Sequence, residues 1–108
     1  MAKTMTIEHN DAKYELEYTR KSVEMMERQG FEIEELQRKP MTYLPALFAG
    51  AFLAHHRYVK RAVIDEIYAQ LPNKGDMLGK LVEMYSEPIV ALMDDPESEG
   101  NASWTVDW

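Results

Sequence analysis

The sequence of 108 residues contains no cysteine. Disulfides, thiolate metal ligands and cysteine nucleophiles are therefore excluded, and the composition fits a cytoplasmic protein. Long apolar runs are lacking as well, because the run over 43–54 has 12 residues and a membrane-spanning helix needs about 20. The start of the chain carries no apolar signal segment. We therefore expect neither export nor a membrane span.

Basic residues are lacking at the C-terminal end. From residue 94 onward the chain has five acids and no base, so residues 1–93 carry only −2 of the net charge of −7. An acidic protein repels phosphate backbones unless it segregates a basic face, so we expect no nucleic-acid partner. Beyond residue 95 the composition changes to Pro, Glu, Ser, Gly and Asn. This predicts one globular domain over 1–94 and a flexible acidic tail over 95–108.

Signatures of catalysis are also missing. The sequence has no Gly-rich phosphate loop, no Ser-centred elbow and no acid pair with a distant base, so we expect no enzyme and no cofactor. His55 and His56 are adjacent and would point about 100° apart on a helix, whereas helical metal ligands usually lie four residues apart. We therefore expect no metal site, with one histidine bordering the core and the other facing water.

Alternating apolar residues predict a β-hairpin over 4–18, with a turn around Asn10 and Asp11. An isolated hairpin is marginal in water, so its apolar face must pack on helices. Helical spacing then predicts helices over about 20–29, 42–56, 59–71 and 76–94, with a single helical turn or ordered loop after Phe31. The expected fold class is mainly α with a small N-terminal hairpin, an α+β arrangement with a bundle of about four helices.

Caps and breakers refine these boundaries. Thr19, Thr42 and Asp76 are candidate N-caps. Gly30 followed by Phe31 is typical of a left-handed C-terminal cap. We expect the last helix to continue through Pro88 with a kink.

Candidate partner-binding residues are apolar and come from three places. Met25 and Met26 are neighbours on the first helix, so they cannot both point straight inward. Phe48 and Phe52 belong to an apolar stretch that covers more than one side of its helix, which is either central in the bundle or shared with a second subunit. Trp104 and Trp108 are predicted to be exposed hydrophobic residues that a partner can capture.

Several phrases carry a resemblance to a known family. YELEYTRKSVEMMERQGF, EIEELQRKPMTYLPALFAGAFLAHHR and LVEMYSEPIVALMDD follow the short hairpin in this order. Together they closely resemble the tail assembly chaperones of long-tailed, siphovirus-type phages and prophages of Gram-positive bacteria, over Met5 to about Asp94. The motifs are diffuse hydrophobic patterns, and the resemblance brings no fixed functional residues.

The resemblance implies a non-enzymatic protein of the host bacterial cytoplasm that is absent from the mature virion. It would bind the long, helical tape measure protein and assist assembly of the tail tube. A frameshift near the end of such genes often gives a longer product that recruits tail tube subunits, and this chain would be the short product. Self-association into a homo-oligomer is also expected, because the chain has more apolar residues than one small core hides.

Two alternatives come from other classes. A small phage-encoded DNA-binding regulator would use the 42–56 and 59–71 helices as a helix-turn-helix, with Arg57, Lys60 and Arg61 on phosphate. The net charge and the apolar Val59, Val63 and Ile67 stripe argue against it, because a recognition helix needs an exposed basic face. A small enzyme using His55 or His56 would place one of them in a pocket beside a carboxylate.

Overall fold

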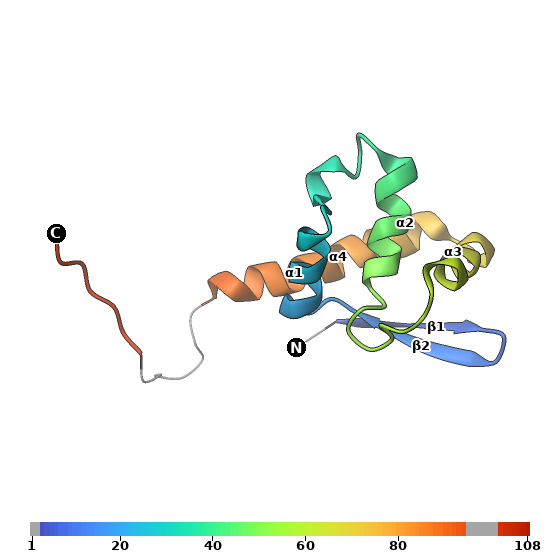
Figure 1. The fold of residues 1–108 in the computed structure, drawn as a ribbon, viewed down its shortest axis with the longest axis horizontal. Coiled ribbons are helices and arrows are strands. Elements are labelled where there is room, and N and C mark those ends of the chain that lie inside the picture. The colour runs from blue at the N-terminus through green and yellow to red at the C-terminus, as the bar shows by residue number, and fades with distance from the viewer. Residues whose placement is uncertain (1–2, 95–101) are drawn as a thin grey trace.

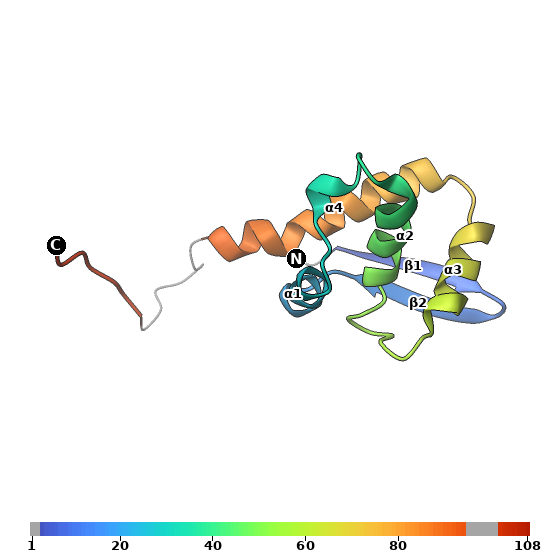
Figure 2. The same cartoon turned by 45° about the horizontal axis from the view of Figure 1, so that its top comes forward.

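The computed structural model describes residues 3–94 and 102–108 (Figure 1). It consists of an N-terminal two-stranded hairpin followed by one 3-10 turn and four α-helices. This confirms the predicted class, mainly α with a small hairpin. Figures 1 and 2 show the helices gathered on one face of the hairpin. No helix within the described ranges is both long and apolar enough to cross a bilayer.

The hairpin joins β1 (Thr4–His9) to β2 (Ala12–Glu17) in antiparallel register, with Thr4 opposite Glu17. Asn10 and Asp11 both have positive φ, at 49° and 67°. This is the conformation that a two-residue primed turn requires, and Asn and Asp tolerate it. Alternate residues, including Ile7 and Leu16, are buried against the helices, as the predicted hairpin over 4–18 requires.

Helix α1 (Arg20–Arg28) has the predicted ends. The Thr19 hydroxyl accepts a hydrogen bond from the Ser22 amide at 3.0 Å, and the Ser22 hydroxyl accepts one from the Thr19 amide at 2.8 Å. At the other end, Gly30 has φ 96° and the Phe31 amide donates to Met26 O at 3.0 Å. The helix therefore closes in a Schellman motif. The single 3-10 turn η1 (Ile33–Glu35) follows.

Helix α2 (Pro40–Gly50) differs from the predicted 42–56 helix at both ends. It begins two residues earlier, because Pro40 occupies its first position, where a missing N–H costs little. Thr42 is consequently inside the helix and does not cap it, and Pro45 lies in the helix interior. The helix ends at Gly50, after which residues 51–55 form turns.

Replacing Thr19 by Ala is expected to lower the free energy of unfolding by about 1 kcal/mol, since the Ser22 amide loses its side-chain acceptor. Thr42→Ala is the matched control, because Thr42 caps no helix in this structure and Ala has the higher helix propensity. Urea unfolding of both variants measures the difference. Equal losses would contradict the assignment of the cap to Thr19.

Helix α3 (Arg61–Gln70) is shorter than the predicted 59–71 helix, and one residue of the predicted apolar stripe turns away from the core. The predicted stripe at steps of four includes Val63, but Val63 is 36% exposed whereas Ile64 and Ile67 are buried. Steps of four advance by about 40° beyond each full turn of a 3.6-residue helix, so such a stripe drifts off the buried face.

Helix α4 (Lys74–Met93) begins two residues before the predicted 76–94 helix. Its N-cap is Asn73, which has φ 52°, and Asp76 lies in the first turn without capping it. The helix continues through Pro88, as predicted, and the expected kink at this residue stays a prediction.

One apolar core joins the hairpin to all four helices. Its largest fully buried side chains are Phe48, Phe52, Leu16, Leu47, Ile67 and Leu81. The ring of Phe48 lies 5.2 Å, centroid to centroid, from the rings of both Phe52 and Tyr68. Helix α2 is therefore central to the fold, which is one of the two arrangements expected for its apolar stretch.

Candidate functional site

A groove of about 740 Å³ runs between the start of α1 and the second half of α4. Its floor includes Tyr18, whose hydroxyl donates to Leu47 O, and its wall includes Val90, Ala91 and Leu92. Burial raises the pKa of Tyr18 and of Tyr85, so both phenols stay protonated at neutral pH. The Tyr85 ring packs edge to face against the Tyr18 ring at 5.4 Å and so supports the one aromatic side chain that lines the groove.

The second half of α4 exposes apolar side chains along this groove. Up to Tyr85 the apolar residues of the helix are buried or partly buried against the core. Beyond Pro88 the exposed fractions rise to 43% for Ile89, 59% for Val90, 56% for Leu92 and 83% for Met93. Clustered exposed apolar side chains beside a concave surface are typical of a protein-binding site. We call this surface, Pro88–Met93 with the adjoining groove, the α4 groove.

The rim of the α4 groove is mainly acidic. Its lining contains four acids and two bases: Glu17, Glu83, Glu87, Asp94, Lys3 and Arg20. Lys3 Nζ lies 2.7 Å from Glu83 Oε1 and 3.7 Å from Glu87 Oε2. The hydrogen bond with Glu83 raises the pKa of Lys3, and the same contact lowers the pKa of Glu83. These pairs tie the start of β1 to α4 and leave net negative charge for a basic partner.

The sequence-predicted partner residues lie in three environments. Met26, Phe48 and Phe52 are buried in the core. Met25 is half-buried on α1. Trp104 and Trp108 are 83% and 102% exposed in a segment, 102–108, without helix or strand. The remaining predicted tail, residues 95–101, lies outside the described residues.

The sequence analysis missed the α4 groove. In the sequence, Ile89 and Leu92 continue the helical repeat of Leu81 and Tyr85 across Pro88, and this repeat does not separate buried turns from exposed ones. The sequence did offer one indication, which is the place of these residues at the end of the last predicted helix. No helix or strand is predicted after them that could pack over their side chains. A second, smaller groove of about 430 Å³ lies between α1, α2 and α3, over Met26, Ala46 and Gly50.

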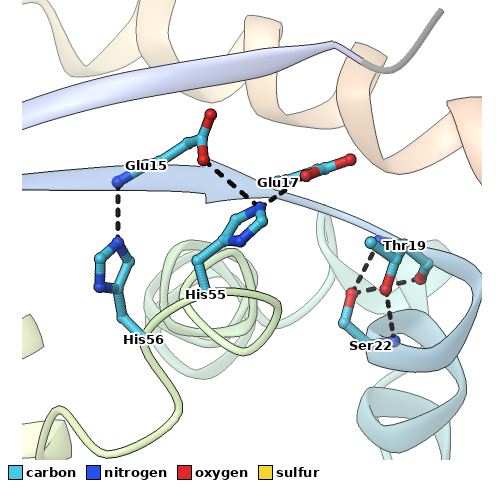
Figure 3. Close-up of polar contacts among 6 residues, drawn as sticks. All are labelled: Glu15, Glu17, Thr19, Ser22, His55 and His56. Atoms are coloured by element: carbon cyan, nitrogen blue, oxygen red, sulfur yellow. Dashed lines mark hydrogen bonds and ion pairs between the residues drawn. The ribbon is translucent and has the colours of Figure 1, made fainter.

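The two histidines bind the outer edge of β2 (Figure 3). His56 Nε2 accepts a hydrogen bond from the Glu15 amide at 2.9 Å, and His55 Nε2 lies 2.7 Å from Glu17 Oε1. His56 also packs its ring against Tyr14 and Phe52, whereas His55 is exposed. Both lie beyond the end of α2, in the turn region that the 42–56 prediction treated as helix. Their contacts hold this region against the hairpin.

His56→Phe is expected to lower the free energy of unfolding by about 1 kcal/mol. Phenylalanine keeps the ring packing but has no acceptor atom, so the Glu15 amide must bond to water instead. His56→Gln, whose carbonyl oxygen can accept, serves as the control. Guanidinium unfolding of the two variants tests this, and a stable His56→Phe protein would show that the bond contributes nothing.

The histidines line neither described groove. Across residues 3–94 and 102–108, no group of three His, Asp, Glu or Cys side chains is placed to hold a metal ion.

The helix-turn-helix alternative needs a connection of three or four residues between its helices. Here α2 and α3 are separated by residues 51–60. Arg61 Nε lies 3.0 Å from Asp65 Oδ1, and the exposed side of α3 also carries Glu66. This face is mixed in charge and lacks the basic character of a recognition helix.

Comparison with known proteins identifies the family of the chain but does not indicate a function. No curated protein and no solved structure matches the chain. One family model, described as "Domain of unknown function (DUF5055)", matches residues 1–108. The chain therefore belongs to the DUF5055 family.

Proposed function

We propose that this protein is a non-enzymatic tail assembly chaperone of a long-tailed phage or prophage, which binds the tape measure protein through the α4 groove. The observation that carries the proposal is the run of exposed apolar side chains on the last turns of α4, beside the 740 Å³ groove. The choice of the tape measure protein as the partner comes from the resemblance of the sequence to tail assembly chaperones. Helix-in-groove binding is a common way to cover an amphipathic helix.

The chemistry of the groove matches such a partner. A tape measure protein is a long helical chain whose apolar stripes would aggregate if they stayed exposed. Ile89, Val90 and Leu92 offer an apolar surface for one turn or more of such a stripe. The acidic rim favours stripes flanked by lysine or arginine and disfavours acidic ones.

The proposal includes the biological setting that the resemblance implies. The protein acts in the host bacterial cytoplasm, self-associates, and leaves before the virion matures. A longer frameshift product of the same gene recruits tail tube subunits, while the short product covers the tape measure.

Co-expression with the neighbouring tape measure gene tests the proposal. We expect the soluble yield of the tape measure protein to rise and the two proteins to purify together. An insoluble tape measure protein that fails to co-purify would refute the proposal. Binding of the protein to non-specific DNA at low salt, in a gel shift, would instead favour the DNA-binding alternative.

A further inference from the structure

The two outer edges of the hairpin differ in their hydrogen bonding. The edge of β2 is closed, because the Glu17 amide donates to Ala51 O at 3.1 Å and the Glu15 amide donates to His56 Nε2 at 2.9 Å (Figure 3). The 51–56 region therefore takes the place of a third strand on that side. A strand that adds to this sheet therefore finds its unpaired backbone groups mainly on β1.

The outer edge of β1 is open. Thr4 and Thr6 pair with Glu17 and Glu15, whose amides point away from β1. In an antiparallel ladder both members of such a pair point their backbone groups outward, and the same holds two residues on, at Glu8. Among the described residues, the backbone N–H and C=O groups of Thr4, Thr6 and Glu8 have no hydrogen-bond partner outside the hairpin. All three side chains are exposed.

The β1 edge lacks the features that usually protect a free strand. Between Thr4 and Glu8 there is no proline, no lysine and no bulge in the register. The nearest lysine, Lys3, is paired with Glu83. Threonine also has high strand propensity. This edge is therefore a template for one more strand.

A matching strand sequence lies in the described C-terminal segment. Trp104, Val106 and Trp108 alternate with Thr105 and Asp107. Side chains two residues apart share a face in a strand but not in a helix. The exposed fractions of the three apolar residues are 83%, 47% and 102%, so one complete apolar face has no cover.

We propose that the 102–108 segment of a second copy adds to the β1 edge as an antiparallel strand. With Thr105 opposite Thr6, the apolar residues Trp104 and Val106 lie opposite Ile7 and Met5, on the helix side of the sheet. Asp107 then lies opposite Thr4 and beside Lys3, and Ser103 lies opposite Glu8. A parallel strand with Val106 beside Ile7 would set Asp107 beside Glu8, a like-charge pair, so charge selects the antiparallel direction.

The position of α4 favours addition of the 102–108 segment to β1 over direct pairing of two β1 strands. Figures 1 and 2 show α4 on the β1 side of the sheet, on the face that carries the other helices. Pairing of two β1 edges about a two-fold axis would bring both α4 helices to the same junction. The extended segment carries no helix. Figure 1 shows the 102–108 segment of the same chain far from the β1 edge. We therefore assign the added strand to a second copy.

Tryptophan fluorescence tests this assignment, because Trp104 and Trp108 are the only two tryptophans. In the full-length protein at high concentration, we expect emission at shorter wavelength and weaker acrylamide quenching than in dilute solution. Thr6→Pro should abolish both effects, since it removes an outward N–H that the hairpin does not use. Thr6→Val keeps the amide and should behave as the natural protein. Circular dichroism verifies that both variants retain their helices.

Two results would overturn the inference. The first is tryptophan quenching that is equal in the natural and Thr6→Pro proteins at every concentration. The second is protection of the tryptophans that persists on dilution, which would place the segment on its own chain and rule out a second copy as its source.

Discussion

Phe48→Asp is expected to leave the protein largely unfolded. Phe48 is fully buried and contacts the Phe52 and Tyr68 rings. Loss of a buried phenylalanine ring alone costs about 3–5 kcal/mol, and an unpaired carboxylate in its place adds several more. The total stability of a small domain is only about 5–15 kcal/mol. Far-UV circular dichroism and a urea titration measure the outcome.

Met41→Asp is the matched control for this prediction, because Met41 lies on the same helix and is 91% exposed. It should leave the unfolding midpoint nearly unchanged. A folded Phe48→Asp protein that has lost only its self-association would show that the apolar face of α2 is an interface between subunits and not a core.

The double variant Val90→Asp, Leu92→Asp is expected to lose binding to the tape measure protein by more than about a hundredfold, corresponding to about 3 kcal/mol. Both side chains are more than half exposed, so the fold should survive. In the complex, two carboxylates would be desolvated against an apolar stripe of the partner. Co-purification and titration with a soluble tape measure fragment measure the loss. Met41→Asp again serves as the control and should bind normally.

Much of the fold followed from local patterns. The alternation around Ile7 and Leu16, with Asn10 and Asp11 between the strands, was enough to place the hairpin, and it is confirmed. Thr19 and Gly30 placed the ends of α1 for the same reason, since both signals act within four residues. The fold class depended on such elements and is correct.

The errors arose where distant residues decide the structure. The apolar run predicted a helix to residue 56, but Ala51 and His56 bond to the edge of β2 instead, and these contacts are invisible to helical spacing. In the sequence, Pro40 resembles the end of the helical turn expected after Phe31, but in the structure it begins α2. A proline at the first helical position gives the same local signal as a proline that closes the preceding turn.

The candidate site was predicted only in part. Trp104 and Trp108 were correctly expected to be exposed, because an acidic tail has nothing to cover them. Phe48 and Phe52 could not be assigned to core or interface from periodicity alone. The α4 groove depends on where the core ends along α4. That point is set by the packing of Tyr18 and Phe31 against Tyr85, which the helix pattern does not show.

Site-specific crosslinking tests the central claim most directly, that the α4 groove binds the tape measure protein. A photoreactive amino acid placed at Leu92, and separately at Met41, should be activated in the co-purified complex. We predict crosslinks from position 92 to the apolar stripes of tape measure helices, and none from position 41. A complex that forms normally but gives no crosslink from position 92, or equal crosslinking from both positions, would contradict the account.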